Sequence, residues 1–81
     1  MHLEIITPDK KVFEGEVISA QFPGTNGSFE VLQNHAPLIS TIERGNVKIT
    51  TANGVQNFTV DGGVVEVLKN HVILLAEAVI V

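Results

Sequence analysis

The sequence predicts an all-β fold, a two-sheet β-sandwich of about eight to ten short strands. Apolar and polar residues alternate along most of the chain, as in residues 47–50, which is the period of a strand with one buried face. Glycine, proline and asparagine separate the apolar runs at short intervals, a spacing typical of sandwiches and barrels. No segment keeps the 3.6-residue period of a helix. We therefore expect residues 1–81 to form a single β-sandwich domain.

The expected strands lie in eight apolar runs, which are residues 3–7, 12–22, 28–32, 38–43, 47–52, 55–60, 64–68 and 72–76. The second run is too long for one flat strand. The side of the strand that carries its apolar residues also changes near residues 15–17. Gly15 permits a bend there, so that one run serves two sheets. Asn26-Gly27 and Asn53-Gly54 supply the positive φ angles of two-residue hairpin turns.

The remaining runs lead to three further expectations. Residues 44–46 and 61–63 are rich in turn residues, so we expect turns there, with a tight bend or a close backbone approach at Gly62-Gly63. Residues 72–76 are continuously apolar, which predicts a strand covered on both faces. The apolar tail, residues 78–81, is unfavourable when exposed, so it either adds a final strand or lies under a partner.

Composition excludes several classes of protein. The net charge is −4 and the five basic residues are scattered without interleaved aromatics, which argues against nucleic acid as a partner. The chain has no cysteine and opens without a basic and apolar leader, so we expect neither a disulfide framework nor a secretory signal. Its longest apolar run is far too short to span a bilayer, and we expect no direct membrane insertion.

The sequence offers no convincing catalytic constellation, cofactor site or metal site. It contains neither a nucleophile elbow nor an ATP-hydrolysing phosphate loop. His2, His35 and His71 are far apart in sequence, so no pair has metal-ligand spacing. Residues 24–27 join two strands and open no helix, which favours a hairpin turn over a phosphate cradle. Glu66 lies in an alternating run and is expected to face solvent.

His35 has two interpretations. It is either a loop histidine that hydrogen-bonds the backbone and fixes the turn around Pro37, or a contact to a partner, since loops on rigid sandwiches often carry binding function. Residue chemistry alone favours the first. With no catalytic group in view, the sequence favours a binding or structural protein over a small enzyme.

Three segments, taken in order, resemble the ε subunit of F-type ATP synthases, which is called δ in mitochondria. Residues 7–17, T-P-D-K-K-V-F-E-G-E-V, are similar to the family's opening strand, turn and strand. Residues 24–38 place a G-T-N-G turn before V-L-Q-N-H-A-P-L, and residues 60–67 read V-D-G-G-V-V-E-V. The competing class is an unrelated small β-sandwich binding or adaptor domain.

The resemblance implies a non-catalytic rotor subunit of the central stalk. One face of the sandwich would pack on the γ subunit, and the end bearing the glycine turn and the histidine loop would touch the membrane c-ring. That assembly couples proton or other ion translocation to ATP synthesis and hydrolysis, and it needs no cofactor in this subunit. The residues expected to face the c-ring are Thr25, Asn26, Ser28, Gln33, Asn34 and His35.

The resemblance also implies a location and a length. The subunit would be peripheral to the cytoplasmic face of the bacterial plasma membrane, or to an organellar inner or thylakoid membrane. Ser28 stands where some members have a carboxylate, Glu30 replaces a common glycine, and Gln33 replaces a frequent proline. Many members continue into a C-terminal helical hairpin that regulates hydrolysis. The sequence ends near the close of the sandwich, as expected of a short form or of a trimmed chain.

Overall fold

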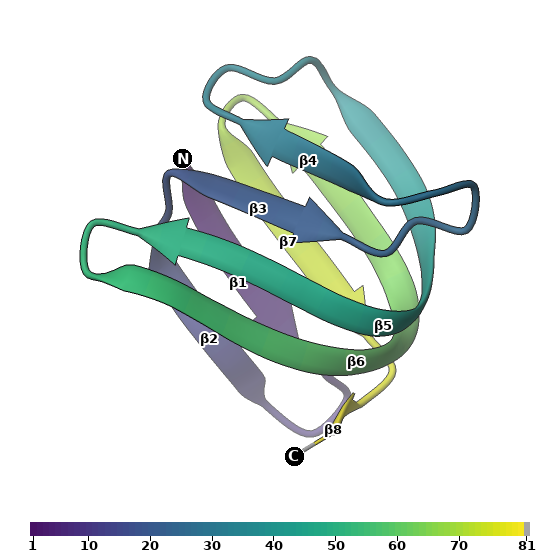
Figure 1. Ribbon diagram of the computed structural model, residues 1–81. Coiled ribbons are helices and arrows are strands. Elements are labelled where there is room, and N and C mark those ends of the chain that lie inside the picture. Colours follow the sequence, from purple (N-terminus) through teal and green to yellow (C-terminus); the bar gives the residue numbers. More distant parts are fainter. Residues whose placement is uncertain (81) are drawn as a thin grey trace.

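Residues 1–80 are described by the computed structural model, and they form eight strands and no helix (Figure 1). The strands are β1 (His2–Ile6), β2 (Lys11–Glu16), β3 (Ser19–Phe22), β4 (Phe29–Leu32), β5 (Leu38–Thr51), β6 (Gly54–Leu68), β7 (His71–Ala76) and β8 (Val79–Ile80). Within this range there is accordingly no helix long and apolar enough to cross a membrane. The all-β prediction is confirmed.

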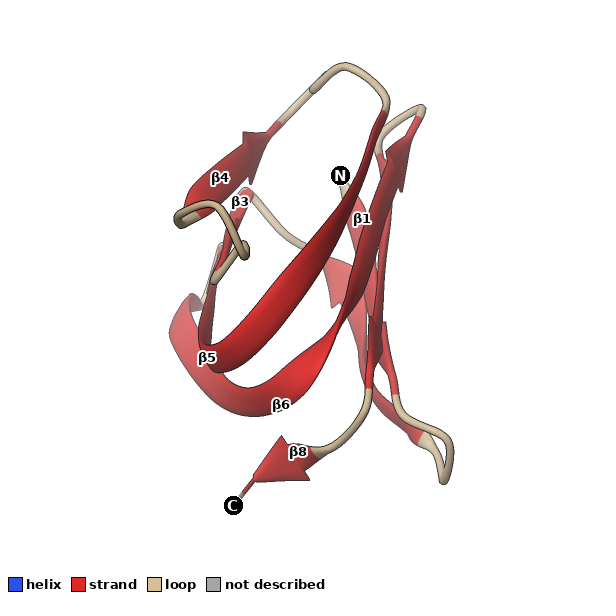
Figure 2. Cartoon of the chain, turned by 90° about the vertical axis from the view of Figure 1, so that its right-hand side faces the viewer, coloured by secondary structure: helices blue, strands red, loops and turns tan. Residues whose placement is uncertain are grey.

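The strands form a single hydrogen-bonded sheet that folds into two layers. Its order is β2-β1-β7-β6-β5-β3-β4, and β8 pairs with β6. The long strands β5 and β6 bend together and pass from one layer into the other (Figure 2). One layer therefore holds β2, β1 and β7, and the other holds β3 and β4. The expected sandwich is confirmed, and its two sheets are the halves of one continuous sheet.

The turns predicted to separate strands at residues 44–46 and 61–63 are wrong, because both segments lie inside the long strands. The close backbone approach expected at Gly62-Gly63 is confirmed, since a Cβ added to Gly63 would overlap the Leu75 carbonyl oxygen. Arg44 pairs with Asp61 and Gly45 with Val60, in the same register as the rest of the β5–β6 pair. Glycine lets the strands bend sharply here without breaking. Gly63 has a φ of 150°, a conformation that residues with a Cβ rarely adopt.

The two Asn-Gly turns differ from the expected geometry. At each one only the glycine takes a positive φ, 119° at Gly27 and 126° at Gly54. The β5–β6 loop lies one residue earlier than expected, since β5 ends at Thr51 and β6 begins at Gly54. The predicted switch within residues 12–22 is confirmed, because β2 and β3 belong to different layers.

The core lies between the layers and is entirely apolar among the described residues. Phe22 packs on Phe29 with ring centroids 5.5 Å apart. Phe13 of β2 meets Phe58 of β6 edge-on, with ring centroids 6.0 Å apart. The expected final strand is present as β8, while Val81 lies outside the described residues. The alternation expected in residues 47–50 is confirmed, because Val47 and Ile49 are fully buried and Lys48 is exposed.

Strand β7 corrects another expectation, that of cover on both faces. Its burial alternates, with Val72 and Leu74 buried, Ile73 half-buried and Leu75 exposed. Only the inner face of β7 meets the second layer, since no element within residues 1–80 covers its outer face. The continuous apolar run therefore marks an open apolar surface and not a doubly covered strand.

Candidate functional site

Strands β5, β6 and β7 share an open surface, the outer apolar face, which consists of Ile39, Val64, Leu68, Ile73 and Leu75. Ile39 is 74% exposed and Leu75 is 54% exposed. The strand register makes the face continuous, because Val64 pairs with Leu75 and Glu66 pairs with both Ile39 and Ile73. A large contiguous apolar patch on a protein surface typically marks an interaction surface.

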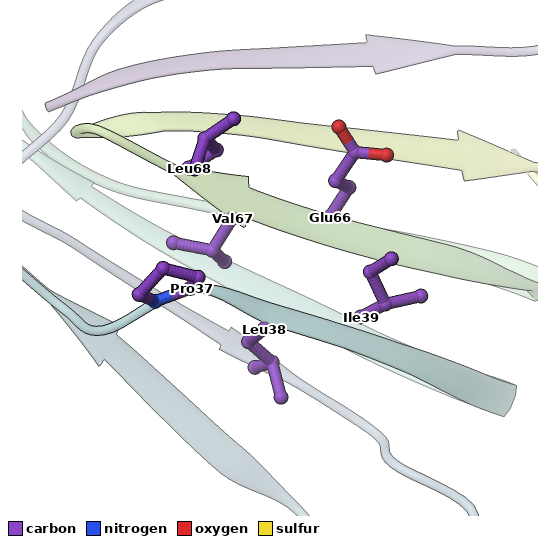
Figure 3. A pocket seen from close by; sticks show the side chains of 6 residues that line it. All are labelled: Pro37, Leu38, Ile39, Glu66, Val67 and Leu68. Carbon is purple, nitrogen blue, oxygen red and sulfur yellow. The ribbon is translucent and has the colours of Figure 1, made fainter.

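Glu66 stands near the middle of the outer apolar face. Figure 3 shows Ile39, Glu66 and Leu68 projecting from one side of the sheet, whereas Leu38 and Val67 point to the other side. These five residues and Pro37 line an open hollow of about 450 Å³. The expectation that Glu66 faces solvent is confirmed. A partner seated on this face would meet one carboxylate within an otherwise apolar surround.

The histidine loop, residues 33–37, borders one edge of the outer apolar face. Asn34 has a φ of 64°; its backbone N–H donates to the Asn70 side-chain oxygen at 2.6 Å, and Asn70 Nδ2 donates to Asn34 Oδ1 at 2.8 Å. The β6–β7 turn thereby holds this loop beside Leu68. Gln33 Oε1 accepts a hydrogen bond from the Met1 amino group at 3.0 Å.

His35 lies in the same loop and makes the local contacts that its first interpretation predicts. Its Nδ1 is 2.6 Å from the Ala36 carbonyl oxygen and therefore donates to it. Its backbone N–H donates to the Leu32 carbonyl oxygen at 3.1 Å. The residue is half-buried, and a partner contact remains a prediction.

The glycine turn, residues 23–28, is anchored to β5. Thr25 Oγ1 lies 3.1 Å from Thr41 Oγ1, and the Thr25 N–H donates to the Thr41 carbonyl oxygen at 3.3 Å. Asn26 and Ser28 are exposed. This trio lies at the start of β4, whereas Gln33 and its neighbours follow the end of β4 (Figure 1). The six predicted ring-facing residues thus flank an edge strand at both ends and do not gather at one end of the sandwich.

Sequence reasoning missed a cluster of charged and histidine side chains on the outer face of β7, β1 and β2. His2 contacts Glu14 Oε2 at 2.9 Å and Glu16 Oε2 at 3.0 Å. These two carboxylates, Glu14 foremost, raise the pKa of His2 above its ordinary value. His71 Nε2 lies 2.8 Å from Glu4 Oε2. That hydrogen bond, with a second from Lys11, lowers the pKa of Glu4.

Comparison with known proteins places this geometry in a family. The model of the ATP synthase delta/epsilon chain β-sandwich domain matches residues 1–81. The chain belongs to this family. An ATP synthase epsilon chain from Chlorobaculum tepidum is 42% identical over 78 residues, covering 95% of this chain and 89% of the relative. One from Pelotomaculum thermopropionicum is 43% identical, covering 94% of this chain and 57% of the relative.

Solved structures of ATP synthases share the family's fold. A chain of the Euglena gracilis mitochondrial ATP synthase, in an assembly described as OSCP/F1/c-ring, superposes with a TM-score of 0.89 at 17% identity. It is covered over 51% of its length. A chain of the Tetrahymena thermophila central stalk and c-ring superposes with a TM-score of 0.83 at 18% identity and is covered over 64%. This chain therefore spans between half and two thirds of each of those structures.

Proposed function

We propose that this chain is a non-catalytic subunit of the central stalk of an F-type ATP synthase. In this role it joins the γ subunit to the membrane c-ring, so that stalk and ring rotate together and ion flow is coupled to ATP synthesis or hydrolysis. The observation that carries the proposal is an open apolar face on a domain of the delta/epsilon family. As part of that complex the subunit is peripheral to the membrane.

The outer apolar face is the surface proposed for γ. Fully burying one large aliphatic side chain is worth roughly 1.5–3 kcal/mol. Ile39, Leu68 and Leu75 are each about half exposed or more, so covering them completes the burial of three such side chains. A partner that covers Glu66, at the centre of the face, must offer it a basic or hydrogen-bonding group, because a buried carboxylate needs one.

The two loops that flank β4 are the surface proposed for the c-ring. Their six candidate side chains are polar, and each loop is held by hydrogen bonds to a neighbouring strand or turn. Anchored polar loops on a rigid sandwich are suited to a contact that must transmit torque without unfolding. A non-catalytic role agrees with the nature of these groups, which bind and position and include no activated nucleophile.

The face assignment is tested with Ile39→Asp combined with Leu75→Asp. Placing two carboxylates in the proposed interface should abolish co-purification with the γ subunit of the same complex, because burying unpaired charges is costly. Val55→Asp is the matched control, since Val55 is 53% exposed on the other layer. Retention of γ by the double variant would overturn the face assignment. Absence of γ from the wild-type preparation would instead favour the adaptor class.

The loop assignment is tested in assembled complexes. Replacing Gln33, Asn34 and His35 with alanine should lower the number of protons pumped per ATP hydrolysed while leaving γ bound. The other trio, Thr25, Asn26 and Ser28, is replaced in a second variant, which reports whether both ends of β4 contribute. An unchanged ratio in both variants would contradict the proposed ring contact.

A further inference from the structure

The cluster on the outer face of β7, β1 and β2 is built by strand pairing. Parallel pairing of β1 with β7 sets His2 beside His71, and antiparallel pairing of β1 with β2 sets His2 beside Glu16. One row across the strands is therefore His71, His2 and Glu16. In the next row Glu4 lies beside Glu14. Two imidazoles and three carboxylates thus share one face, although β1 and β7 lie at opposite ends of the chain.

The side chains of the cluster already face one another. The His2 and His71 rings meet edge-on with centroids 5.1 Å apart. One nitrogen of each ring and one oxygen of Glu4 all lie within 4.8 Å of one another. Glu4 is the most enclosed of the three, with its side chain 16% exposed, while that of His2 is 32% exposed and that of His71 is 48% exposed.

We propose that His2, His71 and Glu4 bind a divalent transition-metal ion, with Zn²⁺ as the best fit. Two imidazole nitrogens and one carboxylate oxygen form a donor set that zinc sites use. Imidazole favours zinc and its neighbours over Mg²⁺ and Ca²⁺, which prefer oxygen ligands alone. This cluster belongs neither to the outer apolar face proposed for γ nor to the two loops proposed for the c-ring.

The geometry needs only a small closure to accept the ion. Zinc–nitrogen and zinc–oxygen bonds near 2.0–2.1 Å place tetrahedral ligand atoms roughly 3.3 Å apart. Because both histidine side chains are partly exposed, their rings can rotate inward while the paired backbones stay fixed. The fourth position faces solvent. The Lys11 amino group, now 3.0 Å from Glu4 Oε1 and 2.8 Å from Glu14 Oε1, gives up its contact with Glu4 to the ion.

The surrounding carboxylates support such a site. Glu14 and Glu16 each hold a ring nitrogen of His2; with the ion bound at one nitrogen, the carboxylate at the other orients the ring. This arrangement of carboxylate, histidine and metal is common around zinc ligands. The carboxylates also lower the local potential, which favours a cation. The bound ion would tie β7 to β1 at the rim of the outer apolar face, since His71 pairs with Leu68.

The test is a titration of chelator-treated full chain with ZnCl₂ followed by calorimetry, and with CoCl₂ followed by visible absorption. We expect one ion per chain, and at least about tenfold weaker binding in His71→Ala and in His2→Ala. His35→Ala is the matched control, because it removes a histidine from outside the cluster, and it should bind like the wild type. Wild-type affinity in the His2→Ala/His71→Ala double variant would overturn the proposal.

A second measurement on the unaltered chain avoids any folding defect of the variants. Histidine ring resonances are followed by NMR during the zinc titration. The proposal requires those of His2 and His71 to shift together and to saturate at one equivalent, with His35 unmoved. A shift confined to His35, or no shift at a protein concentration of tens of micromolar, would refute it. Neither outcome bears on assembly with γ, so the two proposals stand or fall separately.

Discussion

A substitution at Gly63, where β6 bends, tests whether the two layers depend on a close approach of β6 to β7. A Cβ added there would overlap the Leu75 carbonyl oxygen and lie 3.0 Å from Ala76 Cα, and the residue's φ is 150°. Gly63→Ala therefore meets two penalties. The backbone strain costs about 1–3 kcal/mol, and forcing β6 away from β7 costs about 1–3 kcal/mol more.

Gly54→Ala is the control for Gly63→Ala. Gly54 also has a positive φ, 126°, but a Cβ there would meet no atom within 4 Å. It should therefore cost only the strain, about 1–3 kcal/mol. A chain of 81 residues has a free energy of unfolding of about 4–12 kcal/mol at ordinary values per residue. Gly63→Ala should remove a large share of that stability, and Gly54→Ala a smaller one.

The measurement is urea unfolding followed by far-ultraviolet circular dichroism, because the chain has no tryptophan or tyrosine for fluorescence. If the m-value is the same in both variants, the shift of each variant's urea midpoint from that of the wild type compares their losses of free energy of unfolding directly. Equal midpoints for Gly63→Ala and Gly54→Ala would refute the argument, since the close approach of β7 would then carry no cost. A difference matters for function as well, because the bend at Gly63 carries Val64 and Leu68 onto the outer apolar face.

Two further outcomes are expected. Asn70→Ala removes both hydrogen bonds to Asn34, so amide hydrogen exchange in residues 33–37 should accelerate while the core strands stay protected; unchanged exchange would show that the turn does not hold the loop. The second outcome is measured in chelator and low salt, where the contacts of His2 with Glu14 and Glu16 raise its pKa above 6.5. The stability that these contacts add to the folded state is therefore complete below pH 6.5, and it is lost as the pH rises through the pKa of His2 in the folded chain. The urea midpoint of His2→Gln should accordingly fall below that of the wild type at pH 5.5 and approach it at alkaline pH, whereas a gap that does not depend on pH would contradict this linkage.

The sequence by itself determined the fold class, the buried face of the strands whose residues alternate, and the family. Alternation placed Val47 inside and Glu66 outside because the side-chain period of a strand is local and is read directly from the order of residues. The parity change within residues 12–22 marked the passage from one layer to the other. Short motifs in a fixed order carried the family resemblance, which the family match to residues 1–81 confirmed.

Only the tertiary structure decided how distant segments meet. Glycine and asparagine permit either a turn or a bend, and the long-range register of β5 on β6 selected bends at Gly45 and Gly63. The run of residues 72–76 shows how hydrophobic a strand is and not which layers cover it. Glu4 and His71 are 67 positions apart, and no local pattern encodes their proximity. It arises from the parallel pairing of β1 with β7, because strand pairing depends on the packing of the whole chain and not on the neighbours of any one residue.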